Sequence, residues 1–141
     1  MKRIPGVMIL TLLLTVPAFA ADLRIMDSSN VEVLVKDISI DYGGLLGTDK
    51  ETEGIRVSQG EAFIIVKWAT IESVTVTGRD PAAARITAEV ATKDGKKANV
   101  MLVRKGRMKL VGKSDLGDYS IDLEKVKRIT VVSAALTETK K

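Results

Sequence analysis

The sequence contains neither cysteine nor histidine in its 141 residues. Without cysteine no disulfide can form, so the stability of the fold has to come from packing. Without either residue type the usual zinc and transition-metal ligand sets are missing. Ser-His-Asp and Cys-His catalysis are excluded for the same reason. These absences remove the commonest enzymatic and metal-dependent functions.

Other catalytic patterns are also scarce. The Ser-x-x-Lys pattern of histidine-free serine nucleophiles does not occur in residues 21–141. Carboxylates occur in close pairs, Asp115 with Asp118 and Glu51 with Glu53, but they lie in glycine-rich or charged stretches. A catalytic carboxyl needs burial to raise its pKa, and such stretches are typical of solvated turns. We therefore expect no enzymatic activity, no cofactor and no metal site.

The first twenty residues have the pattern of an export signal. Lys2 and Arg3 precede an apolar run over residues 7–16, and residues 18–20 supply a small-x-small cleavage site. The run is shorter than the roughly 20 residues of a membrane span. We expect residues 1–20 to be a cleaved signal peptide, with an uncleaved anchor as the alternative. The mature chain is then periplasmic or secreted by a bacterium, with no membrane-spanning segment.

Charge is distributed unevenly along the chain. Residues 21–90 contain seven Lys and Arg against twelve Asp and Glu, whereas residues 91–141 contain thirteen against six. The two halves therefore carry net charges of −5 and +7. This asymmetry indicates an anionic partner for the second half, or contact between the halves. Outside the cytoplasm nucleic acid is not an expected partner, which leaves an acidic envelope protein or an anionic glycan or lipid. A solvated basic surface is the alternative.

Apolar residues alternate with polar ones in short segments. Residues 23–26 and 31–35 flank the turn-forming residues 27–30, which predicts a hairpin. Ile38 and Ile40 either continue its second strand or follow a bend at Asp37. No segment after residue 20 shows a sustained helical period. The sequence predicts an all-β protein with nine or ten short strands.

One pattern organises the chain and occurs twice. Within residues 64–76, apolar side chains recur in steps of two, with single steps of three at a tight turn. They are Ile64, Val66, Trp68, Ile71, Val74 and Val76. This spacing predicts a strand, a single 3₁₀ turn and a second strand that share one buried face. The pattern recurs in the second half of the chain, at Tyr119, Ile121, Leu123, Val126, Ile129 and Val131.

The apolar residues 86, 88 and 90 follow the apolar residues 31, 33 and 35 by the same number of positions that separates Tyr119 from Ile64. This agreement suggests an internal repeat. The turn residues 78–81 are the expected junction. We predict two related β-units, residues 21–79 and 80–133, followed by a flexible tail over residues 134–141.

The motif of residues 64–76 and 119–131 resembles the last two strands of small SH3-like and Sm-like barrels, where a 3₁₀ turn joins them. The resemblance concerns the fold and transfers no functional residues. Two tandem SH3-like barrels would fit it, and so would one sandwich or barrel built from the duplicated halves.

Two segments are candidate partner-binding sites. Leu45 and Leu46 lie between glycines in an irregular segment and form either a binding lip or a contact with the core. In the second segment, a two-residue loop at 105–106 would place Arg104 opposite Arg107.

The same hairpin would place Leu102 opposite Lys109, with Val100 and Val111 on the same surface. We expect Arg104, Arg107 and Lys109 to form an anion-facing patch on this mixed apolar and basic surface. A solvated hairpin tip is the alternative.

The function expected from these observations is that of an exported, non-catalytic binding or assembly module. It would present a sheet face or edge to a protein, glycan or lipid of the cell envelope. The alternative is a structural accessory domain that binds a small ligand or ion in its Gly/Asp loops.

Overall fold

The computed structural model describes residues 21–43, 49–80, 85–102 and 108–133. These residues form antiparallel strands and two single-turn 3₁₀ helices, which confirms the predicted all-β class. The strands are β1 (Asp22–Asp27), β2 (Glu32–Asp41), β3 (Lys50–Glu51), β4 (Gly54–Gln59), β5 (Ala62–Lys67), β6 (Ile71–Asp80), β7 (Arg85–Thr92), β8 (Lys97–Leu102), β9 (Lys109–Ser114), β10 (Gly117–Asp122) and β11 (Val126–Ser133). The 3₁₀ helices are η2 (Trp68–Thr70) and η3 (Leu123–Lys125). Within the described ranges no helix has the length and apolarity needed to cross a membrane.

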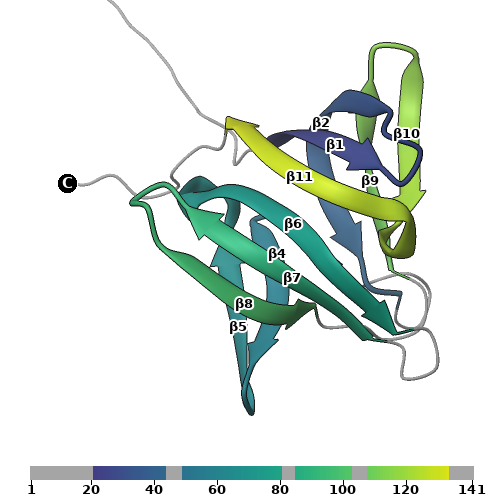
Figure 1. Cartoon of the computed structure of the whole chain (residues 1–141). Coiled ribbons are helices and arrows are strands. Elements are labelled where there is room, and N and C mark those ends of the chain that lie inside the picture. The colour runs from purple at the N-terminus through teal and green to yellow at the C-terminus, as the bar shows by residue number, and fades with distance from the viewer. Residues whose placement is uncertain (1–20, 44–48, 81–84, 103–107, 134–141) are drawn as a thin grey trace, which may run out of the picture.

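The strands form one large curled sheet in the order β10-β9-β2-β1-β11-β6-β7-β8-β4-β5, with β3 beside β2. Figure 1 shows two curls of this sheet, one built from β4 to β8 and the other from β1, β2 and β9 to β11. They are joined where β11 pairs with β6, with Ile129 opposite Val74. Among the described residues the ends of the sheet are β5 and β10, so each of these strands has one edge that no other described strand pairs with. We call this the open edge.

The hairpin predicted at the start of the chain is present, with Leu23 paired to Val35 and Ile25 to Val33. The Asp27 carboxylate accepts hydrogen bonds from the backbone of residues 29 and 31, over 2.8 and 3.1 Å. Further along β2, Asp37 has a φ of 54° where the register to β9 shifts. The second strand therefore both continues and bends, which returns its apolar residues to the core.

Both predicted 3₁₀ turns are confirmed as η2 and η3. Trp68 and Leu123 begin the two turns and are buried, with exposed fractions of 1% and 2%. Their backbone N–H groups donate to the carbonyls of Glu53 and Met108, each over 2.9 Å. After each turn, Ile71 and Val74 in β6 and Val126 and Ile129 in β11 are buried, whereas Val76 and Val131 are only partly buried. This half of the motif therefore matches the prediction at its first two apolar positions.

The strand before each turn differs from the prediction. Ile64 is 39% exposed, and Val66, Tyr119 and Ile121 are only partly buried. The reason is position in the sheet: β5 and β10 are end strands, so each has a neighbour on one side only. The expected continuous buried face therefore begins at the 3₁₀ turn and not before it.

Strand pairing also departs from the expected organisation after β6. Residues 78–80 belong to β6 and do not form a turn. β7 pairs with β6 in one curl, and β1 pairs with β11 in the other. In the sheet β7 therefore corresponds to β1, whereas the sequence repeat predicts that it corresponds to β2. The division expected between residues 79 and 80 falls at the end of β6, and the two units stay a prediction.

Candidate functional site

Four of the five predicted partner-binding residues, Leu45, Leu46, Arg104 and Arg107, lie outside the described residues, so their roles stay predictions. The fifth, Lys109, is the partly buried first residue of β9. The hairpin assumed for this region is wrong. β8 pairs with β7 and β4, whereas β9 pairs with β10 and β2 in the other curl.

The cross-strand partners of Lys109 are two acids, Asp41 in β2 and Asp122 in β10. Opposite charges at directly paired positions are favourable. The anion-facing patch stays a prediction, because Arg104 and Arg107 lie outside the described residues. Val100 and Leu102, which the prediction placed on the same surface, are buried in the core.

The most exposed apolar strand is β5. Phe63 is 79% exposed and Ile65 is 53% exposed, and both lie on the strand face opposite Ile64 and Val66. Apolar residues at every position from 62 to 66 therefore cover both faces of an end strand. The sequence carries this signal as a short apolar run without alternation. The spacing places Ile64 and Val66 on the predicted buried face, but it does not show that β5 is an end strand, so the exposure of this run is not predicted.

Backbone groups of β5 are directed alternately to β4 and to the open edge. β4 and β5 are joined by a two-residue loop, with Gln59 opposite Ala62 and Gly60 at a φ of +61°. In such a hairpin the pair flanking the loop exchanges hydrogen bonds, and every second pair after it does so too. Phe63, Ile65 and Lys67 therefore direct their backbone N–H and C=O groups to the open edge.

An independent contact supports this alternation. Arg56 lies opposite Ile65, and the Arg56 backbone N–H donates to the Tyr42 hydroxyl over 3.0 Å. Arg56 therefore turns its backbone N–H away from β5, as expected for a pair that exchanges no hydrogen bonds.

The opposite end of the sheet has different chemistry. The sequence repeat that relates Ile64 to Tyr119 also relates Phe63 to Asp118 and Ile65 to Ser120 in β10. Asp118 and Ser120 are both exposed. Charged and polar residues on an edge discourage pairing with another chain. The β10 edge is thus protected against strand addition, whereas the β5 edge carries apolar side chains.

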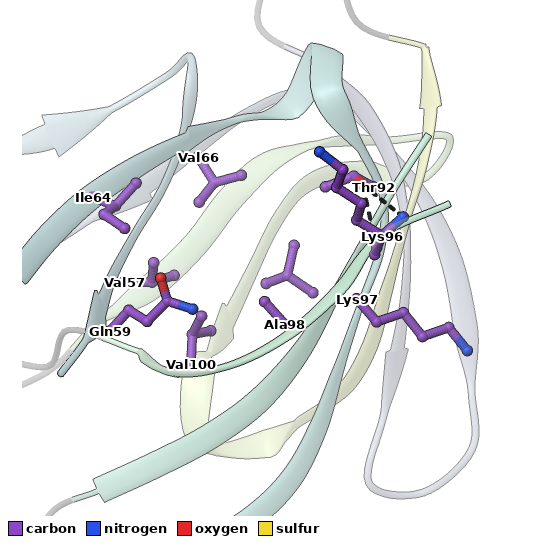
Figure 2. A pocket seen from close by; sticks show the side chains of 10 residues that line it. Val57, Gln59, Ile64, Val66, Thr92, Lys96, Lys97, Ala98 and Val100 are labelled. Atoms are coloured by element: carbon purple, nitrogen blue, oxygen red, sulfur yellow. Dashed lines mark hydrogen bonds between the residues drawn. The ribbon is translucent and has the colours of Figure 1, made fainter. Parts of the chain in front are cut away.

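A cavity of about 130 Å³ lies inside the curl next to β5. Figure 2 shows Ile64 and Val66 pointing into it from β5, opposite Ala98 and Val100. Its apolar lining is completed by Val57 and Val90, and its polar lining consists of Gln59, Thr92, Lys96 and Lys97. In the same view the Lys97 side chain extends away from the cavity.

The turn beside this cavity is held by Thr92. Its hydroxyl donates to the Asp94 carboxylate, which lowers the pKa of Asp94. The backbone N–H of Lys96 donates to the Thr92 hydroxyl over 3.2 Å. The polar groups of this turn therefore form hydrogen bonds with one another.

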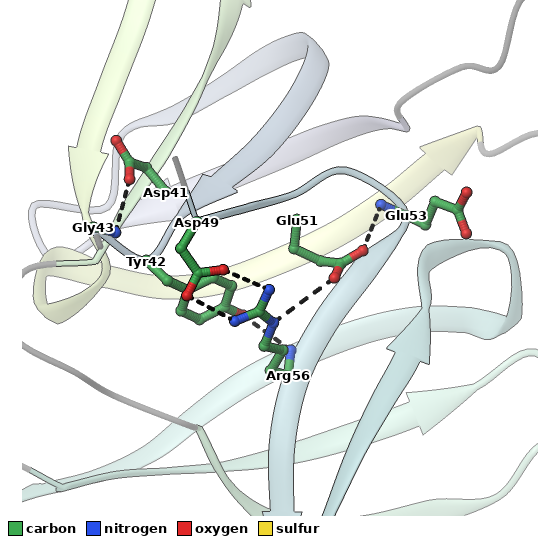
Figure 3. A network of polar contacts seen from close by, with 7 residues as sticks. All are labelled: Asp41, Tyr42, Gly43, Asp49, Glu51, Glu53 and Arg56. Atoms are coloured by element: carbon green, nitrogen blue, oxygen red, sulfur yellow. Dashed lines mark hydrogen bonds and ion pairs between the residues drawn. The ribbon is translucent and has the colours of Figure 1, made fainter. Parts of the chain in front are cut away.

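A network of polar side chains lies where the chain passes from β2 to β4 (Figure 3). The Arg56 guanidinium donates to both carboxylate oxygens of Asp49, over 2.8 and 3.2 Å, and lies 3.7 Å from Glu51. It also stacks over the ring of Tyr42. Burial raises the pKa of Tyr42 to about 12. Arg56 thus pairs with both Asp49 and Glu51, which is typical of a structural contact.

No group of three or more acidic side chains within the described ranges is placed to hold a metal ion. Comparison with known proteins found no match to a family model, to a curated protein sequence or to a solved structure.

Proposed function

We propose that this chain is an exported, non-catalytic binding or assembly module of the bacterial cell envelope, and that it binds its partner by strand addition at β5. The observation that carries the proposal is the exposed apolar edge of β5, where Phe63 and Ile65 lie uncovered beside open backbone groups. An added strand would pair with these backbone groups, and the two side chains would supply apolar contact area.

The contrast between the two ends of the sheet supports this proposal. An open, apolar edge promotes aggregation unless a partner covers it, and proteins usually block such edges with charge. β10 has that protection through Asp118, whereas β5 has apolar side chains at the corresponding positions. A partner for β5 explains why only one of two otherwise similar edges is left apolar.

Strand addition favours a protein among the expected partners, because only another polypeptide can continue the backbone hydrogen-bonding pattern. An anionic glycan or lipid would instead need a cationic surface. Lys109 does not provide one, since Asp41 and Asp122 flank it in the sheet. The remaining basic candidates, Arg104 and Arg107, require their own test, by substitution to alanine and measurement of salt-dependent binding to anionic envelope material.

The architecture proposed for the module is a pair of SH3-like units. Each curl contains five strands in the same relative order, β11-β1-β2-β9-β10 and β6-β7-β8-β4-β5, with a 3₁₀ turn before β11 and before β6. The backbone N–H of Ser28 donates to Lys125, and that of Lys93 donates to Thr70 in the other curl.

These matching contacts support an interleaved repeat. The 3₁₀ turn and the strands next to it in one curl are separated in sequence from those in the other curl by the distance from Thr70 to Lys125. The hairpins β1–β2 and β7–β8 also correspond, but they are separated by the longer distance from Ser28 to Lys93. One unit is thus inserted within the other, and the units are not arranged in tandem.

Site-specific photocrosslinking in living cells tests the proposed function. A photoreactive phenylalanine analogue at position 65 should give crosslinked products from the envelope, because this residue lies on the β5 edge. The matched control places the same analogue at position 120, the corresponding site on β10, and should give none. Equal products from both positions, or no product from position 65, would refute strand addition at β5.

A second candidate function is binding of a small apolar ligand in the cavity beside β5. The observation that favours it is the mostly apolar lining, to which Ile64 and Val66 of β5 contribute together with Ala98 and Val100. In the other curl, the larger Tyr119 stands at the position that corresponds to Ile64.

The volume of about 130 Å³ is close to the roughly 150 Å³ of an engineered protein cavity that binds benzene. Benzene or indole should therefore perturb the NMR signals of Ala98 and Val100, and an Ala98→Phe variant should lose this response. Unchanged signals at saturating ligand would exclude the second candidate. This cavity is not the ligand site that the sequence predicts in the Gly/Asp loops, because its lining is mostly apolar.

A further inference from the structure

We propose, building on strand addition at β5, that the strand that pairs with β5 is β5 of a second copy of this chain. The two strands would run antiparallel about a twofold axis at Ile64, and the two curled sheets would become continuous. This identifies the partner as the protein itself.

Backbone geometry limits the register of such a pair. The groups that face the open edge belong to residues of odd number, among them Phe63, Ile65 and Lys67. Antiparallel pairing requires these residues to meet one another across the axis. A register that places Phe63 opposite Ile65 of the second copy satisfies this requirement and forms up to about eight hydrogen bonds over seven residues.

Pairing of opposite charges favours this register over the adjacent registers. Glu61 precedes β5 and Lys67 ends it, and both are exposed without an ion pair to any other described residue. In the register centred on Ile64, Glu61 lies opposite Lys67 of the second copy at both ends of the paired segment. Shifting the register by two residues in either direction removes both charge pairs. The segment is therefore self-complementary in charge in one register only.

The same register covers the exposed apolar side chains. Phe63 packs against Ile65 of the second copy, and the reciprocal contact forms on the other side of the axis. Aromatic and β-branched side chains at directly paired positions stabilise a sheet. Ile64 meets its own symmetry mate on the opposite face, next to the cavity. The residues with the greatest apolar exposure on β5 are thus those that the second copy covers.

The assembly closes at two copies. A contact between identical edges is isologous, so it uses the β5 edge of both molecules and leaves none for a third. The outer ends of the joined sheet are then two β10 strands, whose edges carry Asp118 and Ser120. These polar edges stop further growth, so we expect a dimer and no fibre.

Sedimentation equilibrium of the mature protein over a range of concentrations tests this proposal. The wild type should be in a monomer–dimer equilibrium. Glu61→Lys and Lys67→Glu each place like charges at both ends of the pair, so each should raise the dissociation constant about tenfold or more. The double variant Glu61→Lys/Lys67→Glu restores the charge pairs and should dimerise like the wild type.

Two further variants distinguish loss of dimerisation from loss of folding. Ile65→Pro removes a backbone N–H that faces the open edge and leaves the bonds to β4 in place. It should give a folded monomer by circular dichroism. Ser120→Pro is the matched change on β10 and should dimerise normally.

A wild type that stays monomeric at all concentrations would overturn the proposal, as would a double variant as weak as the single ones. If a monomeric protein still crosslinks from position 65 to a different envelope protein, strand addition stands and self-pairing is refuted. If neither dimer nor crosslink is found, both proposals fail.

Discussion

The backbone N–H of Arg56 donates a hydrogen bond to the Tyr42 hydroxyl over 3.0 Å, and the guanidinium of the same residue lies 4.3 Å from the centroid of the Tyr42 ring. One residue of β4 thus contacts Tyr42 through both its backbone and its side chain. Tyr42 follows β2, which belongs to the other curl of the sheet. The contact therefore ties the two curls together where the chain crosses between them.

Removing the Tyr42 hydroxyl should destabilise the protein. Tyr42→Phe leaves the partly buried N–H of Arg56 without its acceptor, which should lower the free energy of unfolding by about 1–3 kcal/mol. Urea denaturation measures the change. Tyr119→Phe is the matched control, because no hydrogen bond to the Tyr119 hydroxyl is present among the described residues, and its effect should be smaller. Equal effects would contradict a specific role for the Tyr42 contact.

The pKa of Tyr42 predicts a loss of stability at high pH. Burial raises this pKa from 10.0 to about 12, so the folded state holds the phenolic proton more tightly than the unfolded state does. The associated stability is fully present below pH 10 and is lost as the pH rises to about 12, by at most about 1.4 kcal/mol per pH unit. Lysines titrate in the same range, so the quantity to measure is the difference between wild type and Tyr42→Phe. A difference that stays constant from pH 9 to 12 would contradict the raised pKa.

The two residues that begin the 3₁₀ turns should be equivalent core positions. Trp68→Ala should cost about 3–5 kcal/mol and Leu123→Ala about 2–5 kcal/mol, because both side chains are buried and leave cavities. Phe63→Ala is the control, since this aromatic residue is exposed and its truncation should change monomer stability by less than about 0.5 kcal/mol. An unchanged denaturation midpoint for Trp68→Ala would contradict its burial.

Processing of the signal peptide gives a further prediction. Intact-mass analysis of the protein from periplasmic extract should show a chain that begins at Ala21. Substituting both small residues of the cleavage site, Ala18→Leu/Ala20→Leu, should accumulate the precursor, because signal peptidase requires small side chains there. Wild-type periplasmic protein that retains Met1 would refute export by a cleaved signal.

Local features of the fold could be predicted from the sequence. The hairpin around residues 27–30, the bend at Asp37 and both 3₁₀ turns all follow from turn chemistry and from apolar spacing. Such features depend on residues a few positions apart, so a single sequence contains the information. Burial of Trp68 and Leu123 follows from the same spacing.

Strand neighbours could not be predicted in the same way. The turn residues 105–106 predict that residues 107–111 pair with the strand that precedes them, whereas β9 pairs with β2 and β10. The turn chemistry at residues 105–106 is compatible with a hairpin, but it does not decide which strand offers the better buried surface. That choice depends on contacts between residues far apart in the chain.

The sequence by itself determined the β class, the hairpin turn at residues 27–30, the two 3₁₀ turns and the alternation of side chains between the two faces of each strand. Only the tertiary structure decided that β5 is an end strand, so that Phe63 and Ile65 lie beside an open edge and Ile64 is only partly covered. The physical reason is that alternation determines only which face of a strand a side chain lies on. Backbone hydrogen bonds are nearly the same for every residue, so they do not determine which strands become neighbours. The order of the strands, and therefore which strand lies at an edge, depends on how all the apolar faces pack together.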